Sequence, residues 1–174
     1  MTWSDRLRFP LVLVAVLVLE QTLAPAMAIG GAVPDFLLLV VVATGTLGQP
    51  RLAAIVGFVT GLATDLVVTT PFGLSVVADV LVGTAVAAAF AAPEERGRAW
   101  VPILGAIGSA AGVLLYAVLG GLFGQDQMLS VSLVRIVLLV GVVNGSLCLP
   151  ARAALRWALL PGELARATTP VRRR

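Results

Sequence analysis

Long apolar runs make up most of the chain, and short stretches with Pro, Gly or charged residues separate them. A helix needs roughly 20 apolar residues to cross about 30 Å of hydrocarbon. The pattern therefore predicts an all-α membrane protein, a bundle of six transmembrane helices. The predicted spans are residues 9–29, 35–47, 52–68, 72–92, 101–123 and 130–149.

The second predicted span, residues 35–47, is short for a membrane crossing. At a rise of about 1.5 Å per residue it covers only about 20 Å. We therefore expect it to be tilted, re-entrant, or fused with the third span across the turn at Gly48–Arg51. Fusion would leave five crossings instead of six.

Composition supports a single membrane domain over residues 1–150, followed by a basic tail over residues 151–174. Hydrophobic residues make up 59% of the chain and charged residues only 12%. Soluble domains carry about 25% charged residues, and a soluble fold of this size cannot hide so much apolar surface. The lipid bilayer is thus expected to cover the apolar surface of this chain and is its predicted partner.

The arginines predict the orientation of the bundle, because cytoplasmic loops of membrane proteins are enriched in basic residues. With both termini in the cytoplasm, every arginine except Arg135 falls on the cytoplasmic side, and the outer connections contain none. Since the basic residues flank apolar runs, nucleic acid is not an expected partner. Trp3, Trp100 and Trp157 also fall near the predicted cytoplasmic ends.

Each end of the chain allows a second interpretation. Basic residues before Leu11–Leu19, followed by Ala26-Met27-Ala28, resemble a cleavable signal peptide, although Glu20 argues against it. In the tail, Arg152 and Arg156 share one helix face, which suits either a topology anchor or a short helix on the membrane surface. Residues 168–174 are expected to be disordered.

Ionisable residues inside the apolar runs are the informative polar positions. A charged group at the centre of a transmembrane helix costs roughly 2.5–3.5 kcal/mol on insertion scales, so it needs a compensating contact. We expect Arg135 to pair with Asp79 or Asp65, and Asp35 to start a helix after Pro34. The candidates are Glu20, Asp35, Asp65, Asp79 and Arg135.

The residues that catalysis and cofactor binding usually need are scarce here. The chain contains no His, and Cys148 is its single cysteine, so a zinc or haem site is not expected. No hydroxyl lies beside an evident activating base. The sequence thus predicts a protein that is not an enzyme and holds no cofactor.

Small residues recur at the spacing that lets helices approach closely in lipid. We expect most of these pairs to pack inside the bundle, with one available to a partner. Asn144, within the last pair, is placed for an interhelical hydrogen bond. The pairs are Gly57 and Gly61, Gly108 and Gly112, and Gly141 and Gly145.

One region, Pro34 to Gly83, has a characteristic order of residues. Pro34-Asp35-Phe36-Leu37-Leu38-Leu39 comes first, followed by Gly57-Phe58, Gly61-Leu62, Asp65, then Pro71-Phe72-Gly73-Leu74 and Gly83. At these spacings the region resembles the rod shape-determining protein MreD family. The resemblance marks Gly57, Gly61, Asp65, Pro71 and Gly73 as a signature corner between the third and fourth spans.

The resemblance implies a scaffold of the cell-elongation complex in the bacterial plasma membrane. It would support cell shape and lateral peptidoglycan synthesis through an MreC-like partner, alongside MreB, RodA and a class B penicillin-binding protein. Members of the family are also similar in fold to the substrate-binding membrane subunits of energy-coupling-factor transporters. The alternative function is therefore a vitamin-binding transporter subunit, although the connections at residues 30–33 and 69–71 are short for a lid over a ligand.

Overall fold

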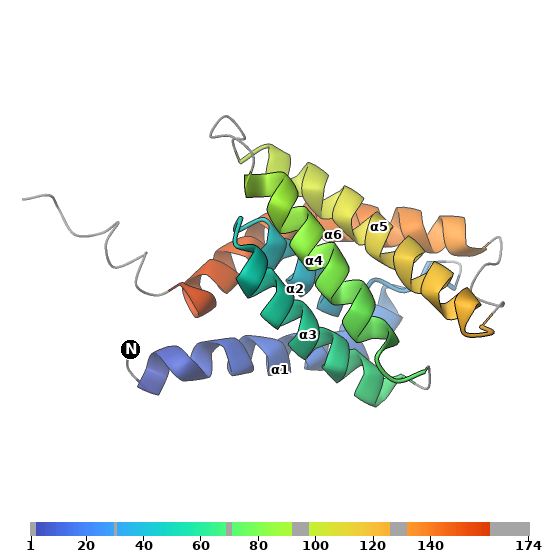
Figure 1. Cartoon of the computed structure of the whole chain (residues 1–174), viewed down its shortest axis with the longest axis horizontal. Coiled ribbons are helices and arrows are strands. Elements are labelled where there is room, and N and C mark those ends of the chain that lie inside the picture. Colours follow the sequence, from blue (N-terminus) through green and yellow to red (C-terminus); the bar gives the residue numbers. More distant parts are fainter. Residues whose placement is uncertain (1–2, 30, 69–70, 92–97, 126–131, 161–174) are drawn as a thin grey trace, which may run out of the picture.

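The computed structural model describes residues 3–29, 31–68, 71–91, 98–125 and 132–160, with side chains from residue 7 onward. In these parts the chain is built from six helices, as predicted, which pack against one another in one bundle (Figure 1). The helices are α1 (Trp3–Ala26), α2 (Phe36–Gly45), α3 (Pro50–Val67), α4 (Leu74–Ala91), α5 (Trp100–Leu122) and α6 (Ser132–Leu159). The expected disorder at residues 168–174 lies outside the described residues.

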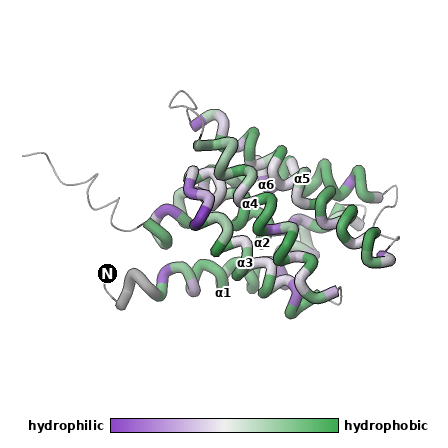
Figure 2. Tube along the Cα trace, in the orientation of Figure 1, coloured by the Kyte–Doolittle hydropathy of each residue, from purple (hydrophilic) through white to green (hydrophobic). Residues whose placement is uncertain are grey.

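Five of the six helices are long and apolar enough to cross a membrane. Apolar residues run along their length, and polar segments gather where α6 ends (Figure 2). α1 and α5 begin earlier than their predicted spans, at Trp3 and Trp100 respectively. The chain is therefore a multi-pass membrane protein, with five helices of spanning length instead of six.

The short helix α2 occupies the centre of the bundle. All ten of its residues, Phe36–Gly45, are buried, and it contacts each of the other five helices. Its length of about 15 Å is half of the hydrocarbon thickness. The predicted fusion with the third span is wrong, because a turn with Gly48 at φ 73° separates α2 from α3.

Non-helical backbone leads into α2 and is partly covered by the protein. Ala32 and Pro34 are buried, and Ile29 and Ala32 exchange two backbone hydrogen bonds of 2.9 and 3.1 Å. Irregular backbone at membrane depth is tolerated where protein surrounds it or where it borders a cavity. The segment thus leads the chain into a helix of half length inside the bundle, and two of its backbone amides are paired within it.

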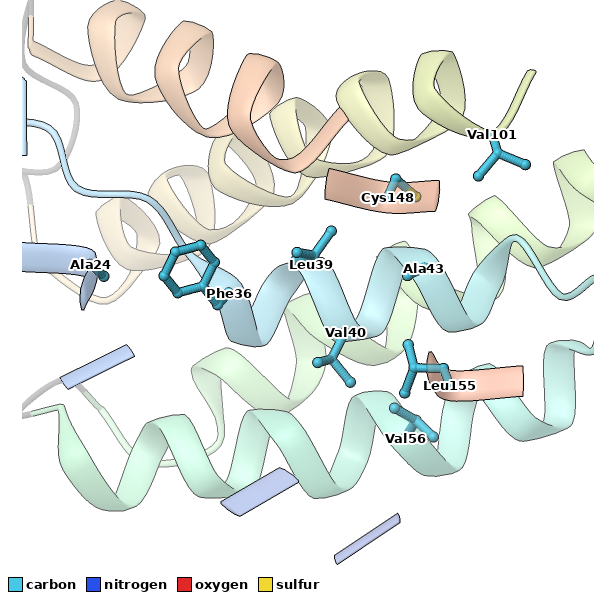
Figure 3. Close-up of a cluster of buried hydrophobic side chains, with 9 residues drawn as sticks. All are labelled: Ala24, Phe36, Leu39, Val40, Ala43, Val56, Val101, Cys148 and Leu155. Carbon is cyan, nitrogen blue, oxygen red and sulfur yellow. The ribbon is translucent and has the colours of Figure 1, made fainter. Parts of the chain in front are cut away.

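The core surrounds α2, as Figure 3 shows. Phe36, Leu39, Val40 and Ala43 of α2 meet buried side chains from four other helices. The contributions from those helices are Ala24, Val56, Val101, Cys148 and Leu155.

Helix α6 is longer than its predicted span. It continues beyond Leu149, through Pro150, to Leu159, and Leu155 is 1% exposed. The helix therefore continues past the predicted span, because the apolar side of the arginine-rich segment packs on the core. Of the two interpretations of this segment, the separate helix on the membrane surface does not fit, because α6 runs through the segment without a break.

Two arginines tie helix ends together at the end of the bundle where α6 finishes. The Arg8 guanidinium lies 4.8 Å from the centre of the Trp157 ring, and its Nη1 donates to the Trp157 carbonyl at 3.4 Å. Arg152 of α6 lies 5.0 Å from the Phe90 ring of α4. These contacts place the beginning of α1 beside the end of α6, so both helices meet at one end of the bundle (Figure 1).

The glycine pairs all face other helices of this chain. A Cβ on Gly61 would lie 2.5 Å from Val76 Cα, and one on Gly57 would lie 2.8 Å from the Asp79 carbonyl oxygen. The α5 and α6 pairs likewise meet α2, α4 or each other. The expectation that one pair is left for a partner is wrong for the arrangement seen here.

Candidate functional site

A cavity of about 450 Å³ opens at the end of the bundle opposite to the arginine contacts. Every helix contributes to its wall, together with the non-helical segment before α2. Most lining side chains are apolar, and the polar ones include three carboxylates. The polar lining residues are Glu20, Gln21, Asp35, Thr64, Ser75, Asp79 and Tyr116.

Two of these carboxylates lie at the beginning of α2. Glu20 Oε2 accepts a hydrogen bond from the Phe36 amide at 2.7 Å, and Asp35 Oδ1 accepts one from the Leu38 amide at 2.8 Å. The first amides of a helix have no partner within the helix and attract negative charge. The expectation that Asp35 starts a helix is confirmed, since it is the N-cap of α2.

The third carboxylate, Asp79, lies one turn into α4. It is 8% exposed, and its Oδ2 lies 3.4 Å from the Thr60 hydroxyl of α3. That hydroxyl also donates to its own helix at Val56, so its contact with Asp79 is weak. Asp79 therefore faces the cavity with little hydrogen-bond support.

Asp65 serves a different purpose from the cavity carboxylates, and it does not line the cavity. It lies near the end of α3, where Oδ2 accepts from the Gly73 amide at 2.8 Å and Oδ1 from the Ser75 amide at 3.1 Å. Gly73 has φ 96°, a conformation that other residues rarely adopt. Asp65 of the signature corner thus holds the turn at Gly73, while Gly57 and Gly61 of the same corner pack α3 against α4.

The predicted pairing of Arg135 with Asp79 or Asp65 is wrong. Arg135 is an exposed residue of α6 and lines a different groove, together with Ile29, Val134 and Leu138. Among the described residues, Asp79 contacts the Thr60 hydroxyl, and Asp65 accepts from the Gly73 and Ser75 amides. The sequence placed Arg135 inside an apolar run but did not show which face of α6 carries it.

Asn144 links three parts of the bundle, which confirms the predicted interhelical hydrogen bond. Its Nδ2 donates to the Asp35 carbonyl at 2.9 Å and lies 3.1 Å from the Ser109 hydroxyl of α5. Asn144 and Ser109 are both fully buried. The contact fixes the beginning of α2, and with it the Asp35 side of the cavity.

Sequence analysis missed Ser75 and Thr60 as part of this site. Ser75 is 2% exposed and lines the cavity, and Oγ has no hydrogen-bond partner. Hydroxyl residues are common in membrane helices, where they bond to backbone carbonyls. Nothing in the sequence distinguishes these two from the others.

The bundle and its buried polar contacts define a multi-pass membrane protein, with arginine contacts at one end and a carboxylate-lined cavity at the other. The family model described as rod shape-determining protein MreD matches residues 6–158. The chain therefore belongs to the MreD family, which gives it a role in rod shape determination. No curated protein and no solved structure matches it.

Proposed function

We propose that this chain is a non-enzymatic scaffold of the cell-elongation complex. It would support lateral peptidoglycan synthesis through an MreC-like partner, with MreB, RodA and a class B penicillin-binding protein in the same assembly. The observation that carries the proposal is the family match over residues 6–158, which takes in all six helices from the second turn of α1.

The proposal includes an orientation with both termini in the cytoplasm. The contact of Arg8 with Trp157 supports it, because it holds the beginning of α1 and the end of α6 together. Arg51 begins α3 and Arg98 precedes α5, so these arginines also lie at that end of the bundle. Basic residues at one end agree with a cytoplasmic position.

Co-purification tests the scaffold function. The tagged full-length chain, extracted in mild detergent, is expected to retain the MreC-like protein of the same cell. Cells that lack the chain are expected to lose rod shape and to recover it when the chain is supplied. Normal shape without the chain, or no retention of the partner, would contradict the proposal.

The partner-facing helix can be found by substitutions that leave the core untouched. Val14, Leu66 and Leu138 are exposed on α1, α3 and α6. Tryptophan at each position adds bulk to the surface without entering the core. One of the three variants is expected to release the partner while the other two serve as its controls.

The cavity favours a second candidate function, that of a vitamin-binding transporter subunit. Its volume of about 450 Å³ is within the range of small-molecule sites. Tight binding of a vitamin such as riboflavin or thiamine by the purified chain would support this alternative. A chain that binds no vitamin and retains the MreC-like protein would exclude it.

A further inference from the structure

Three carboxylates border one cavity. Glu20 comes from α1, Asp35 from the beginning of α2 and Asp79 from α4. Among the described residues that line the cavity, none is Arg or Lys. Negative charge at membrane depth is costly unless a proton or a cation compensates it.

The cavity also contains an unsatisfied polar group that does not belong to the acidic cluster. Ser75 Oγ has no hydrogen-bond partner although the residue is 2% exposed. A buried hydroxyl without a partner costs about 1–3 kcal/mol. Its position in the cavity wall means that a bound molecule can supply the missing partner.

The wall indicates what kind of cation fits. Among the described residues, no three acidic, His or Cys side chains are gathered closely enough to hold a metal ion. The remaining wall is largely apolar, with Leu37, Leu38 and Val113, and Tyr116 adds an aromatic ring. An organic cation suits such a wall, because its apolar body contacts the hydrocarbon side chains and its charge meets carboxylates.

We propose that this cavity binds a small organic ammonium ion that carries an apolar body. The ammonium group lies on the side of the cavity that Glu20, Asp35 and Asp79 border, and the body fills the apolar part between α2, α4 and α5. The same chemistry is available from a free amine in solution or from the ethanolamine headgroup of a phospholipid. The proposal is independent of the scaffold function.

A pair of probes tests the charge requirement. The purified chain is placed in nanodiscs of phosphatidylcholine, and binding of 2-phenylethylammonium and of uncharged 3-phenylpropan-1-ol is measured by calorimetry. The ammonium ion is expected to bind at least about tenfold more tightly, since a charge-assisted contact contributes roughly 1.5–3 kcal/mol. Equal binding of the two probes would overturn the proposal.

Amide substitutions locate the binding site. Asp79→Asn and Glu20→Gln keep the side-chain size and remove a negative charge, so each is expected to weaken 2-phenylethylammonium binding by about tenfold. Asp5→Asn is the charge-matched control, because residue 5 lies about 22 Å from residue 20 along α1. Circular dichroism and gel filtration check that each variant folds. Binding that persists unchanged in both folded cavity variants would overturn the proposal.

A change of lipid separates the two sources of the ammonium group. Phosphatidylethanolamine replaces part of the phosphatidylcholine in the same nanodiscs. If the headgroup occupies the cavity, the apparent Kd of 2-phenylethylammonium rises with the ethanolamine content. An unchanged Kd assigns the cavity to a free amine. The assay contains no partner protein, so its result does not depend on whether the scaffold function is correct.

Discussion

The α3–α4 corner and the beginning of α2 share one kind of hydrogen bond but differ in how tightly the surrounding helices pack. In both places a carboxylate from the preceding helix accepts amide hydrogens at the start of the next one, Asp65 for α4 and Glu20 for α2. At the corner, Gly57 and Gly61 let the two helices touch. At α2 the cavity opens beside the carboxylate.

The difference lies in what surrounds the two carboxylates. α3 and α4 pack along their whole length. In contrast, only 6% of the apolar part of α1, within Leu7–Ala26, is buried. α1 reaches the core at Ala24 and through the hydrogen bond from Phe36 to Glu20. The corner is therefore a structural element, and the region around Glu20 is where the molecule has room for another group.

The largest expected effect comes from breaking the close contact at the corner. A methyl group on Gly61 would lie 2.5 Å from Val76 Cα and 2.7 Å from its nitrogen, and neither backbone atom can move alone. Gly61→Ala is expected to lower the free energy of unfolding by about 3 kcal/mol, measured by titration with SDS in mixed micelles.

Gly141→Ala is the matched control, since it belongs to the same kind of glycine pair. Its Cβ would lie 3.3 Å from the Ala106 carbonyl oxygen and 3.7 Å from the Ala110 Cβ. A small adjustment accommodates it, so we expect a loss below about 1 kcal/mol. Equal losses for the two variants would contradict the special closeness of α3 and α4.

An intermediate effect is expected when the two capping carboxylates are changed to amides. Asp65 uses both oxygens, so Asp65→Asn turns one acceptor into a donor facing an amide hydrogen, at a cost of about 1–3 kcal/mol. Glu20 uses Oε2 for Phe36, and Glu20→Gln keeps an acceptor there, so its loss is expected to be under about 1 kcal/mol. Unfolding in SDS measures both, and a larger loss at Glu20 would reverse the comparison.

The smallest expected effect concerns the two residues that sequence analysis had paired. Because Asp79 and Arg135 line different spaces, Asp79→Ala and Arg135→Ala should act independently. A double-mutant cycle is expected to give a coupling energy below about 0.5 kcal/mol. A coupling of 1 kcal/mol or more, on the scale of contacting pairs, would mean that the two side chains meet in the membrane.

The helices and the corner residues were largely predictable from sequence. Apolar runs set the number of helices, and Pro71 and Gly73 with Asp65 marked the turn between α3 and α4. The cavity was not predictable, because it depends on which face of each helix turns inward. Asp79 and Arg135 both lie inside apolar runs of the sequence, yet one faces the cavity and the other lines an exposed groove.

The sequence alone determined that the chain is a membrane protein, that it forms six helices, and which of its glycines allow close packing. These properties follow from local composition and spacing, because an apolar run of sufficient length favours a helix in lipid and small residues at regular spacing allow helices to approach. Tertiary structure decided that α2 is a buried half-length helix, that α6 extends into the arginine-rich segment, and that Glu20, Asp35 and Asp79 share a cavity. Those features depend on contacts between residues far apart in the chain, which no local pattern specifies.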